Sequence, residues 1–470
     1  MSMPAGSAAG IAPHGRNAIV PGATLSRWTM SYFAAALIAL VAAELLMAIG
    51  YGYPNAPVES AQTLVLVHLV ALGWLSLLMC GALFQFVPVL VARPLYSDAL
   101  PLPTLLCLVA GVVALLLGFL QMGGTVSIAF AFLPTAATLL AIGFGLVLWN
   151  LGRTLWAARP LPLPACFVAV GLCSIAVTVT LGIIFSLVLG GVTDNPYLVD
   201  IVVSGVPLHA IAGLGGWLTF TAMGVAYRLL AMFMLAPEPG GRRSRAGFYC
   251  GTASLAVAVG GGVTAICLAA SLTLILVAAG LLGLCALLLY GTDILHLYRA
   301  RKRRVIELNS RMAGFAMAGL AASVILIAAL AGFGILAQHA AAVVFLVAFG
   351  WLSGLGLAKL YKIAAFLTWL ECYGPVLGKT ATPRVQDLAV ERRAIRWFLL
   401  YFLGVWGATA TLLLEIPTVF QACAGLMLIG SLGIIVQLVR IRQLLDVNVT
   451  LRLPPGVSVP RLLLCSAQHD

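Results

Sequence analysis

The chain has few charged residues for its length. Only 9% of its 470 residues are Asp, Glu, Lys or Arg, whereas 62% are hydrophobic and the mean hydropathy is +1.11. Soluble domains carry about a quarter charged residues, so this composition excludes a soluble globular domain. The sequence also lacks a phosphate-binding loop, a Gly-x-Ser-x-Gly elbow, a His-Glu-x-x-His pair and any Cys-x-x-Cys pair among its ten cysteines. Their absence excludes the common classes of soluble enzyme and metal site that carry these motifs.

Long apolar runs are abundant instead. A helix needs about 20 consecutive apolar residues to cross the hydrocarbon core, and irregular backbone in lipid would leave amide groups unpaired. The sequence therefore predicts an all-α transmembrane fold of about twelve helices. The predicted spans are 28–50, 62–87, 102–122, 127–151, 163–190, 201–234, 247–268, 272–297, 312–330, 335–370, 395–414 and 419–441.

Lys and Arg are missing from every second connection between these runs. The connections after odd-numbered spans carry only acidic charges, namely Glu59, Asp194, Asp200 and Glu415, whereas the other connections and both ends carry arginines. Cytoplasmic loops are enriched in Lys and Arg, so we predict an N-in, C-in, multi-pass protein of the bacterial cytoplasmic (inner) membrane. The same sorting explains the net charge of +12 without a nucleic-acid partner. The three basic residues inside spans are expected to reach the inner interface with their long side chains; they are Arg228, Lys359 and Lys362.

The domain organisation follows from these spans. Residues 1–26, rich in Gly, Ala and Pro, are predicted to form a disordered cytoplasmic tail, and residues 27–444 form the transmembrane domain. Residues 445–470 are predicted to form a second cytoplasmic tail, too short for a catalytic domain. Membrane lipid is therefore an expected partner of the domain between the tails.

One motif occurs three times, at equivalent positions along the chain. The segments Gly73-Trp74-Leu75-Ser76, Gly216-Trp217-Leu218-Thr219 and Gly350-Trp351-Leu352-Ser353 fall on predicted helices two, six and ten. Their tryptophans are 143 and 134 residues apart. We therefore predict three pseudo-symmetric four-helix repeats, at about 27–152, 161–297 and 311–441. Close helix packing through the small residues explains much of each motif by itself.

A histidine precedes each of these tryptophans toward the outer end of its helix. His68, His209 and His339 lie six, eight and twelve residues before their tryptophans, or ~9, ~12 and ~18 Å at the helical rise. The first two are thus nearly level, and His339 lies higher. An ionisable residue within a span indicates function, and imidazole is a common ligand of metals and of haem. The alternative is a neutral histidine that forms a hydrogen bond across a helix interface.

A carboxylate lies close to the predicted depth of the first histidine. Glu44 is about six residues from the outer end of the first predicted span. A lone carboxylate in an apolar helix is expected to be protonated or paired. We therefore consider Glu44 a partner that orients His68 without binding the cofactor itself, or part of a proton route, or alternatively an interfacial residue that faces water.

The architecture and these residues resemble the haem–copper oxidase subunit I superfamily, and especially its shorter relatives such as the NnrS-like proteins of nitric oxide metabolism. The closest local matches are His68-Leu-Val-Ala-Leu-Gly-Trp74 and the segment from His209 to Trp217. The resemblance covers roughly residues 28–441. It implies that His68 binds low-spin haem b and that His209 binds copper. His339 falls on the helix that supplies further haem ligands in that superfamily.

The sequence also departs from this superfamily. The seventh predicted span contains no histidine where the catalytic proteins have a His-His pair for copper, and the tenth has only His339 where they have His-x-His. His209 is followed by Ala-Ile-Ala-Gly and by no tyrosine. A dioxygen-reducing binuclear centre is therefore not expected, because most of the histidines of the catalytic centre are missing.

Three functions remain open at the level of the sequence. The first is a haem- and/or copper-binding membrane protein in electron transfer, nitric oxide or oxygen stress, or metal handling, with a redox partner or respiratory-complex subunits around it. Its expected metal ligands are His209 and His68, and its cofactor ligands are His68 and His339. The second is a cofactor-free structural or assembly subunit of a respiratory complex. The third is a twelve-span transporter, although transporter repeats usually divide the chain into two halves.

Overall fold

The computed structural model describes residues 26–465, which form helices and loops with no strand. The predicted tail at 1–26 lies, except for its last residue, outside the described residues. The described part contains twelve helices that are long and apolar enough to span a membrane. In chain order they are α1 (Thr29–Ala48), α2–η1–α3 (Ala61–His68, Leu69–Ser76, Leu77–Val91), α4 (Pro101–Met122), α5 (Phe132–Ala157), α6 (Leu163–Leu189), α8–η2–α9 (Val206–Ala210, Ile211–Phe220, Thr221–Met234), α10–η3–α11 (Arg242–Ala256, Val257–Gly261, Gly262–Cys267), α12 (Thr273–Arg299), α13 (Leu308–Gly332), α14–η4–α15 (Ala340–Phe345, Leu346–Ser353, Gly354–Tyr373), α16 (Glu391–Leu413) and α17 (Pro417–Arg442).

The predicted all-helical fold and the number of spans are confirmed. Several predicted bounds differ from the observed ones by about five residues. At the sixth span, which was expected to begin at residue 201 and begins at Val206, the difference has a structural cause. A separate helix, α7 (Pro196–Ser204), precedes it and ends at Gly205. Pro207 lies in the first turn of α8, where its missing N–H costs no helical hydrogen bond. Because Pro207 has no N–H to donate to the carbonyl four residues earlier, the helical hydrogen bonds are interrupted between the two helices.

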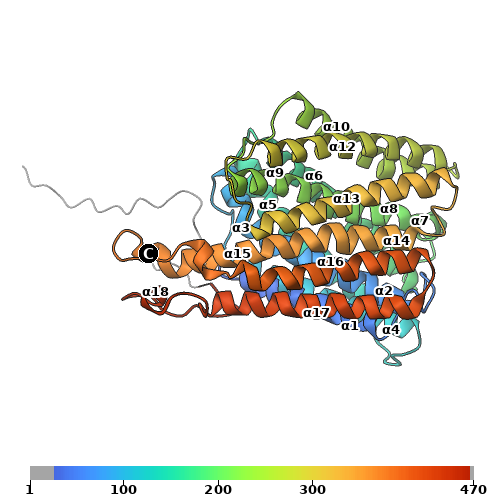
Figure 1. The fold of residues 1–470 in the computed structure, drawn as a ribbon. Helices are drawn as coiled ribbons and strands as arrows, with labels where there is room; N and C mark the ends of the chain where they lie inside the picture. The colour runs from blue at the N-terminus through green and yellow to red at the C-terminus, as the bar shows by residue number, and fades with distance from the viewer. Residues whose placement is uncertain (1–25, 466–470) are drawn as a thin grey trace, which may run out of the picture.

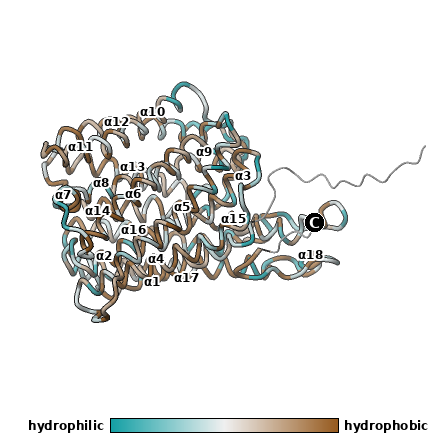
Figure 2. The backbone as a smooth tube through the Cα atoms, turned by 180° about the vertical axis from the view of Figure 1, so that it is seen from behind, coloured by the Kyte–Doolittle hydropathy of each residue, from teal (hydrophilic) through white to brown (hydrophobic). Residues whose placement is uncertain are grey.

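The surface of the bundle is apolar between its two ends. Figure 2 shows hydrophobic residues along the helices and hydrophilic residues concentrated in the connections at both ends. Large apolar side chains point outward from several helices; Ile38, Leu274 and Ile325 are 71%, 79% and 68% exposed. Such a surface is stable in contact with lipid acyl chains and not with water. The chain is therefore a multi-pass membrane protein.

Both ends of the described chain lie at the same end of the bundle (Figure 1). The backbone N–H of Cys465 donates a hydrogen bond to the carbonyl of Arg27 over 3.0 Å. We call this the basic end, because arginines such as Arg242 and Arg243, at the start of α10, are on this side. The opposite, acidic end carries Glu59, Asp194, Asp200 and Glu415.

Helices two, six and ten of the twelve spans form the centre of the bundle. In the sixth and tenth spans 72% of the most apolar window is buried, against 17% in the eighth span, α12. The segments η1, η2 and η4 contact one another pairwise. The first and last spans, α1 and α17, also pack together, so the outer helices close around the central three (Figure 1).

Glycines allow the first helix of a predicted repeat to approach the second. A Cβ on Gly81 of α3 would lie 2.5 Å from Cβ of Tyr32 in α1. A Cβ on Gly224 of α9 would lie 2.5 Å from Cβ of Phe167 in α6 and 2.6 Å from the carbonyl oxygen of Pro164. These two glycines occupy the same position relative to their tryptophans. Any larger residue at either position would clash with the neighbouring helix.

Candidate functional site

The three repeated tryptophans form a closed ring of hydrogen bonds at the centre of the bundle. All three indoles are buried. Trp74 Nε1 donates to Ser353 Oγ (2.7 Å), Trp351 Nε1 to Thr219 Oγ1 (3.3 Å), and Trp217 Nε1 to Ser76 Oγ (3.0 Å). Each motif therefore donates from its tryptophan to the Ser or Thr of another motif, always in the same order. The ring satisfies three buried indole N–H groups that would otherwise cost free energy.

The helices change to π geometry where they carry this ring. The segments η1, η2 and η4 are π-helical and contain all three Gly-Trp-Leu-Ser/Thr motifs. Ser76 Oγ donates to the carbonyl of Ala71, and Ser353 Oγ donates to the carbonyl of Ala348, five residues earlier in each case. These hydroxyls thus accept from an indole and donate to their own helix. π-Helical segments are rare and occur frequently at functional sites.

Two histidines lie next to each other on the acidic side of the ring. The ring centroids of His68 and His209 are 6.4 Å apart, and their planes are inclined by 34°. Phe119 packs on His68 with centroids 4.9 Å apart, and Phe185 packs on His209 at 5.3 Å. The structure therefore brings together the two histidines that the sequence places at nearly equal depth.

Hydrogen bonds leave one nitrogen of each imidazole available. His68 Nδ1 lies 2.8 Å from the carbonyl oxygen of Leu64, which selects the Nδ1–H tautomer and leaves Nε2 with a lone pair. His209 Nδ1 is buried and has no hydrogen-bond partner in residues 26–465. Gly182 provides room for this ring, because a Cβ there would lie 3.4 Å from His209 Cε1. A hydrogen bond from the other ring nitrogen to a backbone carbonyl is the usual support of a metal-binding histidine.

The other two predicted site residues lie apart from this pair. His339 is half-buried and precedes the first turn of α14, at the start of the tenth span. Glu44 is buried in α1, where its Oε1 accepts a 2.9 Å hydrogen bond from Ser431 of α17 and its Oε2 has no partner in the described chain. No group of three or more His, Cys, Asp or Glu side chains that could hold a metal ion occurs within residues 26–465. A metal at the histidine pair would therefore have two ligands of these types from the described chain.

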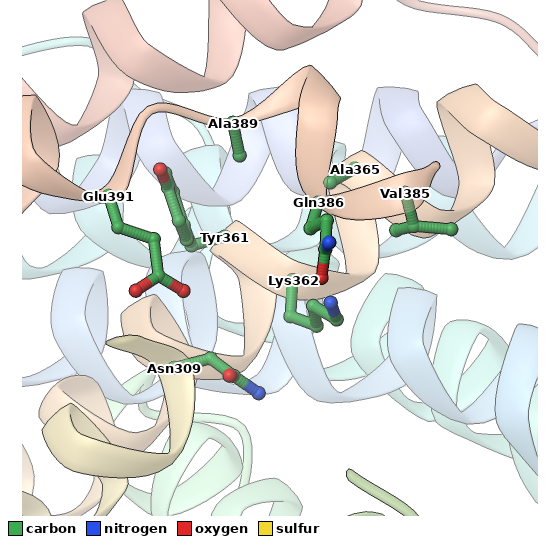
Figure 3. A pocket seen from close by; sticks show the side chains of 8 residues that line it. All are labelled: Asn309, Tyr361, Lys362, Ala365, Val385, Gln386, Ala389 and Glu391. Carbon is green, nitrogen blue, oxygen red and sulfur yellow. The ribbon is translucent and has the colours of Figure 1, made fainter. Parts of the chain in front are cut away.

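A polar cavity lies at the basic end, away from the histidines. Side chains of α13, α15, the short 3₁₀ segment η6 (Val385–Leu388) and α16 converge on it in Figure 3. Asn309 is 2% exposed, and neither its amide oxygen nor its amide nitrogen has a hydrogen-bond partner in the described residues. The cavity volume is about 20 Å³, enough for about one water molecule. A bound water would satisfy Asn309, so this cavity has a structural explanation.

The expectation that all three basic residues within spans reach the interface is wrong for Lys359. Arg228 forms an ion pair with Glu238, and Lys362 with Glu307. Lys359, in contrast, is 6% exposed, and its Nζ has no hydrogen-bond partner among residues 26–465. The sequence shows the charge in the span but does not show which face of the helix carries it.

Comparison with known proteins assigns no family: no family model matches the chain, and no curated protein matches it. The similarity to the haem–copper oxidase superfamily therefore stays a prediction from the residues quoted above. The described geometry itself offers two half-buried imidazoles whose ring centroids are 6.4 Å apart.

Proposed function

We propose that the protein is a metal-binding membrane protein that holds a copper ion between His68 and His209. The observation that carries this proposal is the half-buried pair of imidazoles with centroids 6.4 Å apart. Imidazole nitrogen is a good ligand for copper, so the side chains of His68 and His209 would hold the ion. When bound, copper would supply one-electron chemistry, so electron transfer, nitric oxide or oxygen stress, and metal handling are the functions this site supports.

The residues fit a single ion better than haem b. Haem iron also accepts axial histidines, but the porphyrin needs a flat slot beside or between the imidazoles. Phe119 and Phe185 pack directly on the two rings. A haem at this pair requires those phenylalanines to move, whereas a lone ion does not. Haem b remains the alternative cofactor of the same site, and the spectrum of the purified protein distinguishes the two.

The experiment is a metal and pigment analysis of protein purified from a host supplied with copper and haem. We expect close to one copper per chain, its loss in the His68→Ala and His209→Ala variants, and its retention in the matched control His339→Ala. A Soret band that disappears with His68→Ala would replace copper by haem. Folded wild-type protein without copper and without a Soret band would exclude both cofactors.

A second candidate follows from the small number of ligands. Because no third His, Cys, Asp or Glu joins the pair within residues 26–465, a scaffold without a cofactor is the alternative. The protein would then be a structural or assembly subunit of a respiratory complex. Co-purification with such a complex, together with the absence of copper and haem, would favour this function over the first.

The orientation in the membrane is also part of the proposal. The distribution of arginines between the two ends supports a cytoplasmic basic end in a bacterial inner membrane. The histidine pair would then lie toward the outer face, where a periplasmic redox partner can approach it. Single cysteines placed at Glu59 and at Arg243 in a cysteine-free chain should react with an impermeant thiol reagent from outside and from inside, respectively. The reverse pattern would invert the topology.

A further inference from the structure

A second cavity lies on the other side of the tryptophan ring. Leu75, Leu218 and Leu352, which directly follow the three ring tryptophans, all line it. A Cβ on Gly356, another lining residue, would lie 3.7 Å from Cζ2 of Trp74. The cavity therefore begins directly at the ring, on the side of the basic end, and extends between the central helices toward that end.

Equivalent residues of the three central helices line this cavity, and one of them is charged. Eight residues after the tryptophans stand Ala82, Val225 and Lys359, and all three contribute to the wall. The wall is otherwise apolar. In two of the helices Ala or Val fills this position. Packing therefore does not explain the lysine in the third helix.

The ammonium group of Lys359 has no counter-ion in the described chain. Glu307 is a carboxylate whose charge acts on Lys359. It already pairs with Lys362 over 2.8 Å and with Arg303. Lys359 Nζ lies 5.6 Å from the ring centroid of Phe233, and Lys362 Nζ lies 5.8 Å from the same ring. This aromatic contact attracts the cation but supplies neither a hydrogen bond nor a negative charge. A buried ammonium in this state is stabilised by an anion that enters the cavity.

The wall defines what kind of anion fits. The cavity volume is about 80 Å³, several times what one water molecule needs. A small hydrated anion would lose its water against leucine and alanine and find only one cation. A dianion would keep an unbalanced charge. A carboxylate with an apolar chain matches both features, because its head pairs with Lys359 and its chain lies along the wall.

The wall also shows from which side such a ligand enters. The three leucines next to the ring are fully buried, whereas Met79, Ala82, Val225 and Ile363 are half-buried. The cavity is thus closed at the ring and more open toward the basic end. We propose that it is a binding site for a monocarboxylate with an apolar chain, held by Lys359.

Photo-labelling tests this site directly. The full chain in nanodiscs of zwitterionic lipid is irradiated with octanoate that carries a diazirine on its alkyl chain, and labelled residues are identified by mass spectrometry. We expect labels on the cavity wall, displaced by unlabelled octanoate and not by octanol, which has the same chain without the charge. If palmitate added to the membrane displaces the label and octanoate does not, the ligand is a fatty acid of the membrane.

Two variants make the test specific for the lysine. In Lys359→Met we expect wall labelling to fall about tenfold, the loss of one charge-assisted contact. Lys362→Met, which removes the paired neighbour on the same helix, should keep it. Equal labelling in Lys359→Met and wild type would overturn the proposal. If Lys359→Met does not fold, equal displacement of the label by octanol and octanoate in the wild type overturns it as well.

Discussion

At the scale of single residues, the buried tryptophans and the acceptors of their N–H groups hold the centre together. Trp217→Phe keeps the aromatic surface but removes the donor to Ser76, whose hydroxyl still donates to Ala71. We expect a loss of about 1 kcal/mol in the free energy of unfolding, the usual value of one hydrogen bond. A lower unfolding midpoint in detergent would show it. Trp406→Phe, at an indole that is 38% exposed, should leave the midpoint unchanged.

A buried ion pair is a second test at this scale. Arg442 Nη1 and Glu371 Oε2 are 2.8 Å apart, and both side chains are 4% exposed. Removing one partner leaves an unpaired buried charge, so Glu371→Ala should destabilise the fold by about 3–5 kcal/mol. The Arg311–Glu391 pair is 3.5 Å apart and far more exposed, and Arg311→Ala should cost less than about 1 kcal/mol. Thermal unfolding curves of equal midpoint for the two variants would refute this ranking.

Sequence and structure agree on some residues and not on others for physical reasons. His68 and His209 could be predicted to lie at nearly equal depth because helical rise fixes their depth relative to the repeated tryptophans. Glu44 could not be assigned in the same way, since depth does not give the direction of a side chain. In the structure it points to Ser431 on α17. Lys359 was misinterpreted for the same reason.

At the scale of helices, close contact depends on individual glycines. Gly224→Ala places a methyl group 2.5 Å from Phe167 Cβ and 2.6 Å from a backbone oxygen of α6, so we expect destabilisation by about 1–3 kcal/mol. Gly152→Ala in α5 meets no atom within 4 Å. There alanine should stabilise the helix by about 0.5–1 kcal/mol. Opposite shifts of the unfolding midpoint are the expected result, and a shared sign would contradict it.

The sequence predicted the helices well because a spanning helix is dictated by twenty apolar residues in a row. It did not predict the π-helical segments η1, η2 and η4. In η1 and η4 a serine hydroxyl donates to the carbonyl five residues earlier, and the three segments contact one another, features that apolar periodicity does not reveal. It also missed the break between α7 and α8. Gly205 and Pro207 were visible there, but proline is common in membrane helices.

At the scale of the whole molecule, the chain after α17 is tied back to the bundle. Asp446 accepts hydrogen bonds from Arg393 of α16 and Arg440 of α17. Burial raises the pKa of the Asp446 carboxyl, but these two hydrogen bonds outweigh burial and hold the pKa below its usual range. The Arg442 guanidinium also donates to the carbonyl of Leu464 over 3.2 Å. The predicted carboxy-terminal tail is therefore packed as far as Cys465.

The Asp446 contacts make this attachment dependent on pH. A carboxyl with a lowered pKa in the folded state stabilises that state above its unfolded pKa of about 4, and the contribution disappears as the pH falls through the folded pKa. Hydrogen exchange of residues 443–452, corrected for intrinsic rates, should therefore rise on acidification below pH ~4. Asp446→Asn should show the faster exchange already at neutral pH. Protection that is the same in both proteins at neutral pH would contradict this role.

Pseudo-symmetry is the largest-scale prediction, and the hydrogen-bond ring supports it. Three donors, three acceptors and three π-helical segments recur at the same positions of the motif. The repeat could be found in the sequence because tryptophan is infrequent and the spacing follows the number of spans. His339 is farther from its tryptophan than the other two histidines are, and the sequence therefore already places it at another depth than the pair.

The most direct test asks whether His68 and His209 bind the same ion. Copper affinity is measured for wild type, His68→Ala, His209→Ala and the double variant, each reconstituted in nanodiscs. If one ion bridges the pair, each single variant loses binding as completely as the double variant, because the two losses are not additive. Losses that add up independently, or single variants that bind copper as tightly as the wild type, would contradict a shared site.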